Sequence, residues 1–272
     1  MSARSIHSRL TGLAAAALLL SFAPTSALSQ DDTFEWEGRL AAGATLHVQN
    51  IVGNVHAVLA SGNRAEVVAT KMGRRSDFGE VDIEVAETDD GIKICVSYGS
   101  WNHGGAPCEH DDRDRPDNRR DDDIDVSVEF EVRVPAGVDF RGGTVTGDVE
   151  ATGLRSQVAA SSVTGDVTVS STELVSANTV TGSLDVELGN ADWDDLDFHT
   201  VTGDITLRLP AGLDANFEFQ SISGDFESDF EVEIENQRRR LVGTRVRGTI
   251  GDGGRTLSLK TVSGDVRLRR AG

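Results

Sequence analysis

The sequence predicts an all-β protein that folds as a single-domain β-solenoid. The main observation is a repeated stretch of the form Val-Thr-Gly-Asp-Val, first seen clearly at 144–149. A β-branched residue precedes each glycine by two places, and an apolar residue follows it by two. The glycines of the clear copies are Gly147, Gly165, Gly182, Gly203, Gly224 and Gly264. A period of roughly 20 residues with one glycine turn per copy is typical of stacked short strands, because one unit cannot bury its apolar side alone.

The spacing of these glycines is 18, 17, 21, 21 and 40 residues. The last interval equals about two periods. We therefore expect that other structure has replaced one copy between Gly224 and Gly264.

The residues around each glycine predict two corners in every coil. After the glycine, apolar and polar residues alternate, as in 205–209, which places one set inward and the other in water. Before the glycine, apolar residues stand at the seventh, fifth and second places, as in Phe217, Phe219 and Ile222. This slip in phase predicts one corner, and Thr-Gly-Asp predicts the other, because glycine adopts positive φ and aspartate caps backbone N–H groups.

Aspartates follow most of the glycines and should form a ladder along the stack. They are Asp148, Asp166, Asp204, Asp225 and Asp265, with Ser183 in one copy. Carboxylates on neighbouring rungs repel by of order 1 kcal/mol per pair. Either each accepts backbone N–H groups at its own corner, or cations such as Ca²⁺ lie between rungs. The Gly-Gly-x-Gly-x-Asp pattern of calcium-binding repeats is not matched, so we expect structural turns without metal or other cofactor.

Residues 1–29 have the pattern of a signal peptide. Arg4 and Arg9 precede the apolar run 13–22, and small residues stand at a cleavage point in 27–29. The apolar run is shorter than the about 20 residues of a membrane span. We expect an exported protein, periplasmic or extracellular at the cell surface, without membrane insertion after signal cleavage.

Residues 31–270 are expected to form one β-strand-repeat domain, with its clearest repeats in 141–270. Alternating stretches in 31–95 predict an N-terminal strand-rich cap, since open rung edges invite aggregation. Within it, 50–55 is a degenerate copy built on Gly53, with Asn54 in place of aspartate. The net charge of −19 disfavours nucleic acid as a partner.

Residues 97–123 interrupt the pattern with a run of both charges and predict a mobile insert. A metal loop is the alternative, and its candidate ligands are His103, His110, Asp111, Asp112 and Asp114. Their spacing does not match an EF-hand, and interleaved arginines would repel a cation. We therefore expect no metal site there.

Cys95 and Cys108 are the only cysteines. In an exported protein an even cysteine count favours a disulfide. We expect the two to pair, tying the insert to a strand. A metal-binding thiolate pair is the alternative.

The succession of Val-Thr-Gly-Asp-Val copies, ending in 251–266, resembles the bacterial putative-adhesin family, a group of exported β-strand-repeat proteins of unknown function. The resemblance covers most of residues 34–270 and is strongest from 141 onward. It implies a β-solenoid-like fold in a cell-envelope or surface setting. It carries over no catalytic residues.

These observations favour a non-catalytic binding, adhesin-like or scaffolding module, whose partner is an unidentified envelope polymer or protein. Flat, threonine-rich strand faces would be the contact surface. One alternative is a carbohydrate-active enzyme on a short β-helix, which needs two carboxylates across a cleft. Outward-facing candidates for that pair are Glu150, Asp185, Glu187 and Glu227. A third hypothesis is that the protein is an accessory factor in envelope-stress signalling.

Overall fold

The computed structural model describes residues 32–99, 108, 124–190, 195–239 and 243–271. The predicted signal peptide lies outside the described residues. So does almost all of the predicted insert, of which only 97–99 and Cys108 are described.

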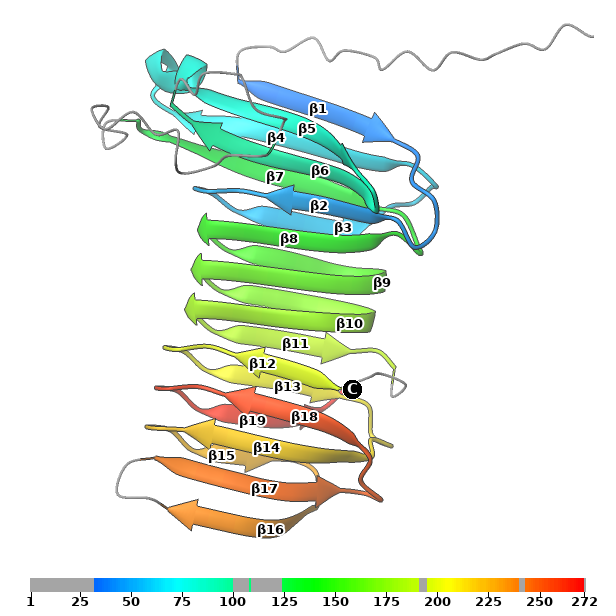
Figure 1. Ribbon diagram of the computed structural model, residues 1–272, viewed down its shortest axis with the longest axis vertical. Helices are drawn as coiled ribbons and strands as arrows, with labels where there is room; N and C mark the ends of the chain where they lie inside the picture. Colours follow the sequence, from blue (N-terminus) through cyan, green and yellow to red (C-terminus); the bar gives the residue numbers. More distant parts are fainter. Residues whose placement is uncertain (1–31, 100–107, 109–123, 191–194, 240–242, 272) are drawn as a thin grey trace, which may run out of the picture.

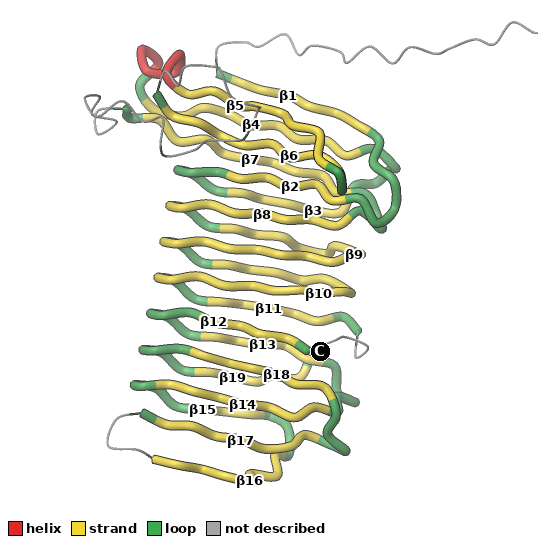
Figure 2. The backbone as a smooth tube through the Cα atoms, in the orientation of Figure 1, coloured by secondary structure: helices red, strands yellow, loops and turns green. Residues whose placement is uncertain are grey.

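The chain forms an elongated column of stacked coils (Figures 1 and 2), which confirms the predicted β-solenoid. Each coil contributes one strand to each of two facing sheets. Strands that lead into the glycine corners belong to sheet I, and strands that leave them belong to sheet II. The long strands β9 and β10 belong to both, with their first halves in sheet II and their second halves in sheet I. The repeated coils are built from parallel strands: β2 (Thr45–Gln49), β3 (Val55–Leu59), β8 (Asp139–Thr146), β9 (Val149–Thr164), β10 (Val167–Thr181), β11 (Leu184–Leu188), β12 (Leu196–His199), β13 (Ile205–Leu209), β14 (Ala215–Ser221), β15 (Phe226–Ser228), β18 (Arg255–Lys260) and β19 (Val266–Arg270).

The predicted glycines stack directly above one another. A Cβ atom placed on Gly165 would lie 1.9 Å from the carbonyl oxygen of Gly147, and one on Gly147 would lie 2.2 Å from that of Gly53. The same contact repeats along the column. Its order is Gly53, Gly147, Gly165, Gly182, Gly203, Gly264 and Gly224. The degenerate copy at Gly53 is thus a true rung.

The final copy does not lie at the end of the column. Strands β18 and β19 lie between β12/β13 on one side and β14/β15 on the other (Figure 1). The 40-residue interval holds an antiparallel hairpin, β16 (Val232–Arg239) and β17 (Thr244–Ile250), which extends sheet I beyond β14. The prediction that other structure replaces one copy is therefore confirmed, and that structure is a hairpin. The order of the last two coils along the column is the reverse of their order in the sequence.

Mostly antiparallel strands form the N-terminal cap that the sequence predicts. They are β1 (Thr33–Gly38), β4 (Ala65–Gly73), β5 (Val81–Thr88), β6 (Gly91–Tyr98) and β7 (Val126–Val134), with the short 3₁₀ helix η1 (Arg75–Glu80) before β5. In this cap β6 and β7 pair in parallel with β2 and β3. The cap is therefore continuous with the repeated coils.

Inward side chains of both sheets form one continuous apolar core. Its largest fully buried members include Phe130, Phe140, Phe198 and Phe219. The alternation predicted after each glycine is observed, since Ile205, Leu207 and Leu209 are fully buried.

The alternation before each glycine differs from the prediction. The β-branched residue two places before it is exposed, and the hydroxyl residue three places before it is buried, as Val180 and Thr179 show. The residues seven, five and three places before each glycine therefore all point inward, and the alternation of inward and outward side chains continues without a break. Each coil has one sharp corner here, at the Val-Thr-Gly-Asp stretch, instead of two.

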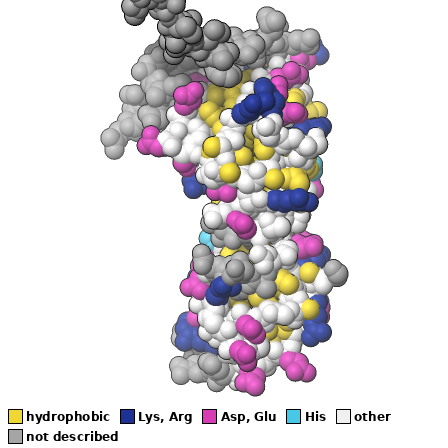
Figure 3. Space-filling view, turned by 90° about the vertical axis from the view of Figure 1, so that its right-hand side faces the viewer, with side chains coloured by type: hydrophobic (Ala, Val, Ile, Leu, Met, Phe, Trp, Pro, Cys, Tyr) yellow, Lys and Arg dark blue, Asp and Glu magenta, His cyan; other side chains and the backbone are white. Residues whose placement is uncertain are grey.

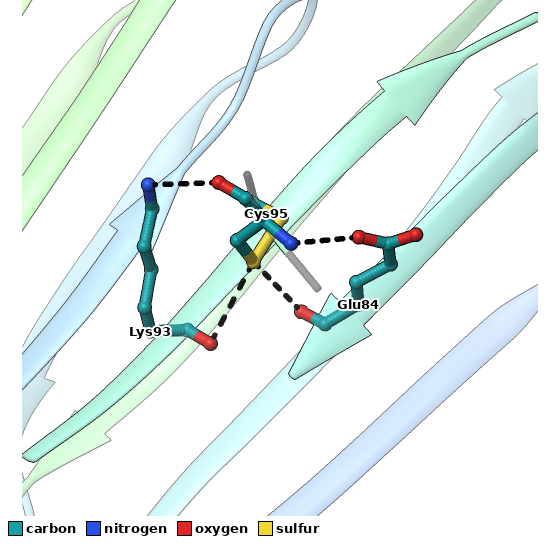
Figure 4. The surroundings of a disulfide bond; sticks show 4 residues. Glu84, Lys93 and Cys95 are labelled. Atoms are coloured by element: carbon teal, nitrogen blue, oxygen red, sulfur yellow. Dashed lines mark hydrogen bonds between the residues drawn. A yellow bond between two sulfur atoms is a disulfide. The ribbon is translucent and has the colours of Figure 1, made fainter. Parts of the chain in front are cut away.

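The predicted disulfide between Cys95 and Cys108 is present in the structure. Figure 4 shows its surroundings: the Cys108 N–H donates to Glu84 Oε2 at 2.8 Å, and Lys93 Nζ donates to the Cys108 carbonyl at 3.4 Å. Glu84 is the one carboxylate grouped with the two sulfurs among the described residues. Because both sulfurs are bonded to each other, they offer no thiolate to a metal.

Candidate binding surface

The glycine-corner edge of the column carries two parallel rows of exposed side chains, here called the corner rows. The apolar row consists of β-branched residues that are 36 to 56% exposed: Ile51, Val145, Val163, Val180, Val201, Val262 and Ile222. The neighbouring row is mostly hydroxyl-bearing and also exposed: Val52, Thr146, Thr164, Thr181, Thr202, Ser263 and Ser223. Rungs in a sheet are about 4.8 Å apart, so the rows repeat the same chemistry at that interval.

Backbone hydrogen bonds between rungs hold the corner rows in place. The amide of Val201 donates to the Val180 carbonyl at 3.1 Å, and that of Val262 donates to the Val201 carbonyl at 3.2 Å. β-Branched side chains have few rotamers to lose. The apolar row is therefore a rigid ridge, and binding to it would cost little side-chain entropy.

A buried row of hydroxyl groups lies beneath the corner and was not predicted. Thr179 Oγ1 donates to the Gly165 carbonyl at 2.9 Å, and Ser162 Oγ donates to that of Gly147 at 2.9 Å. Thr144, Thr200 and Thr261 make the same bond, whereas the buried Ser221 hydroxyl has no partner. A hydroxyl or amide residue three places before every glycine, including Asn50, is the sequence signal that could have revealed this row.

The aspartate ladder is a chain of hydrogen bonds between rungs. The amide of Asp166 donates to Asp148 Oδ1 at 2.8 Å, and the amide of Ser183 donates to Asp166 Oδ1 at 2.7 Å. Asn54, Asp204 and Asp265 accept in the same way from Asp148, Asp265 and Asp225. Each carboxylate thus caps the next rung and not its own corner. The expectation that each aspartate caps its own corner was therefore wrong, because the backbone amide that it accepts from belongs to the neighbouring rung.

Arg267 relieves the charge repulsion at the one place where three carboxylates meet. It donates to Asp204 Oδ2 at 2.7 Å and to Asp265 Oδ2 at 2.8 Å, and it lies 3.9 Å from Glu227. The Arg267 hydrogen bond, followed by the Asp265 amide, lowers the pKa of Asp204. Asp204 is therefore held in its charged form by the neighbouring arginine.

The carboxylates considered for glycoside hydrolysis do not gather into a cleft. On the outer face of sheet II, Glu150 lies 3.3 Å from His56, Asp185 pairs with Arg208, and Glu227 pairs with Arg269 at 2.8 Å. A hollow on the N-terminal part is lined by 60–64, Glu66 and Arg133 and so contains one carboxylate. Three of the four candidate carboxylates, Glu150, Asp185 and Glu227, therefore each lie beside a basic side chain on the sheet surface.

The edge opposite the glycine corners has a different surface. Figure 3 views this edge and shows acidic, basic and apolar side chains interspersed along it. Uniform rows are thus a property of the glycine-corner edge, where the coils repeat similar residues at matching positions.

Residues 137–269 match the model of the family described as Toastrack DUF4097. This segment is thus similar to a Toastrack domain. It spans β8 to β19 and includes all the glycine corners except Gly53. The predicted resemblance to an adhesin-like domain of unknown function is thereby confirmed.

Two solved structures are similar to the chain as a whole. One is a "putative cell adhesion protein" of Clostridium sporogenes, with 10% identity and a TM-score of 0.45, covering 88% of this chain and 100% of its own. The other is a "putative adhesin" of Bacteroides fragilis, with 10% identity and a TM-score of 0.31, covering 91% of this chain and 99% of its own. No curated protein matches the sequence. Neither likeness says what this chain binds.

In the described part of the chain, no helix is long and apolar enough to cross a membrane.

Proposed function

We propose that this chain is an exported, non-catalytic module of the cell envelope or surface that binds an extended envelope polymer along its corner rows. The observation that carries the proposal is the apolar row, in which β-branched side chains stay exposed at every glycine corner. Exposed apolar side chains in a continuous row mark an interaction site more often than scattered ones do.

The linear form of the rows favours a polymer over a compact partner. Each rung offers the same valine or isoleucine beside, in nearly every case, the same threonine or serine. A ligand with repeating units would meet this pair several times, and linked weak contacts give a much higher overall affinity. A compact partner would use only a few rungs.

The test is binding of the purified chain to an array of glycans and envelope components, with and without millimolar Ca²⁺. The double variant Val163→Gln/Val180→Gln disrupts the middle of the apolar row without changing charge. Thr168→Gln/Thr206→Gln is the matched control, because these threonines point outward from sheet II. We expect calcium-independent binding to one polymer, weakened about tenfold by the first variant only.

Other outcomes would contradict the proposal in different ways. Binding that needs Ca²⁺ would point to cations at the aspartate ladder. Equal binding by both double variants, with unchanged circular dichroism, would exclude the corner rows. Cleavage of an array glycan would favour an enzyme, and an absence of binding would favour a scaffold with a protein partner.

A further inference from the structure

A hollow of about 170 Å³ lies on the outer face of sheet I, near the N-terminal end of the segment 137–269. It is lined by His47 of β2, Arg141 and Gly143 of β8, Ser161 of β9, and Ser176 and Asn178 of β10. These residues come from four neighbouring strands of one face. The hollow shares no lining residue with the corner rows, although Gly143, Ser161 and Asn178 each stand two residues before a member of the apolar row.

Small residues in register create the hollow. Gly143 pairs with Ser161, which pairs with Asn178, and Arg141 pairs with Ala159. Gly142 faces inward, where a Cβ would meet the Phe140 ring at 2.8 Å, so core packing explains that glycine. Gly143 has no such reason, because a Cβ there would meet only Ser161, at 3.3 Å from its hydroxyl. The open floor at Gly143 is therefore not required by the fold.

One wall of the hollow is formed by His47 and Arg141, which occupy paired positions on β2 and β8. Burial, followed by the nearby Lys93 and Arg141, lowers the pKa of His47, so Arg141 is the charged group of this wall. Among the described residues no carboxylate lies within ion-pair distance of Arg141. Asp90 is the acidic group near enough to influence both His47 and Arg141. The chain has a net charge of −19, yet the lining of this hollow contains Arg141 and no carboxylate.

We infer that this hollow binds an oxyanion, a carboxylate or a phosphate, carried on a unit no larger than one sugar ring. The Arg141 guanidinium suits an oxyanion because it presents paired donors in a planar fork. Ser161, Ser176 and Asn178 offer hydroxyl and amide donors on the opposite side. The volume is below the about 300–1,000 Å³ of pockets that enclose drug-sized ligands, so the hollow fits one small unit that enters from solvent.

The experiment titrates the purified, isotope-labelled chain with glucuronate, inorganic phosphate and uncharged glucose, and follows backbone amide shifts by NMR. We expect saturable shifts at Gly143 and Ser161 with one or both anions and none with glucose. Comparison of the two anions tells a carboxylate site from a phosphate site. Absence of saturable shifts with either anion would overturn the inference.

Three variants decide whether the hollow itself is the site. Arg141→Gln should weaken anion binding about tenfold, the effect of losing a charged hydrogen-bonded pair. Ala159→Phe should abolish it by filling the hollow from an outward position without changing charge. Arg155→Gln removes the same charge from an exposed position near the opposite edge and should leave binding unchanged. Equal weakening by Arg141→Gln and Arg155→Gln, or binding that survives Ala159→Phe, would overturn the inference.

These outcomes are distinct from those of the polymer test. A chain that binds a polymer through the corner rows but binds neither anion would refute the hollow alone. Anion binding that persists in Val163→Gln/Val180→Gln, without any polymer binding, would refute the corner rows alone.

Discussion

Replacement of Gly165 by alanine should destabilise the protein by about 2–6 kcal/mol. Gly165 has a φ of +148°, and a Cβ there would lie 1.9 Å from the Gly147 oxygen and 2.5 Å from its carbonyl carbon. Both contacts are with backbone, so no flexible side chain can move away. The backbone strain costs about 1–3 kcal/mol. Separation of these two rungs would also weaken the bonds Gly147 N–Thr164 O, 2.9 Å long, and Val149 N–Asp166 O, 3.0 Å long, worth about 0.5–1.5 kcal/mol each.

Gly153→Ala is the matched control for this prediction. Gly153 also has positive φ, at +67°, but a Cβ there meets nothing within 4 Å. We therefore expect Gly153→Ala to lower the free energy of unfolding by only about 1–2 kcal/mol, the cost of the left-handed conformation for alanine. Urea unfolding followed by far-ultraviolet circular dichroism measures both changes. If Gly165→Ala were no more destabilising than Gly153→Ala, the close stacking of glycine corners would be wrong.

Three further predictions concern the other interactions of the column. Thr179→Val keeps the shape but removes the buried hydroxyl, and should cost about 1–3 kcal/mol because a corner carbonyl loses its donor; urea unfolding checks this, and an unchanged midpoint would contradict it. Asp204→Asn should lower the melting temperature at neutral pH by about 1–3 °C. The pKa of Asp204 is lowered in the folded state, so its contribution to stability is present above the ordinary aspartate pKa and is lost as the pH falls through the lower folded value. The difference in melting temperature between the variant and the unchanged protein should therefore narrow below about pH 4. Reduction of the Cys95–Cys108 disulfide, which closes a 13-residue separation, should cost about 2–4 kcal/mol and expose two thiols to maleimide; labelling without reductant would argue against the bridge.

The glycine and aspartate positions could be predicted from sequence because their chemistry is local. Only glycine tolerates the φ of the corner, and a short carboxylate after it can reach a backbone amide. The direction of that hydrogen bond could not be predicted. Whether Asp148 caps its own coil or that of Asp166 depends on the distance between rungs, which no single copy encodes.

The orientation of the corner side chains was mispredicted because hydrophobicity alone places Val180 inside and Thr179 outside. The structure reverses this, since the corner carbonyl of Gly165 needs a donor that only the hydroxyl supplies. Burying a valine there would leave the carbonyl without a partner, at a cost comparable to what the valine gains. The apolar row is thus exposed because the buried position beside it is occupied by a hydroxyl residue that donates to the corner carbonyl.

The reversed order of the last two coils was also beyond the sequence. Each copy offers nearly the same apolar and hydroxyl residues to its neighbours, so the coil at Gly264 fits against Gly203 as well as that at Gly224 would. Charge gives one distinction, because Arg267 of β19 lies between Asp204 and Glu227 and can pair with both. A coil in sequential order would place Asp204 beside Asp225 without that arginine.

The ends of the column explain why the fold needs this reversal. A stack of parallel coils offers unpaired strand edges that could add another copy. At the N-terminal end the antiparallel pairs β1–β4 and β5–β6 close the two sheets. At the other end β16 and β17 must follow β14, the strand they pair with through β17. Because that hairpin terminates sheet I, the coil of β18 and β19 is placed between two earlier coils and not after them. The corner rows therefore end at Ile222.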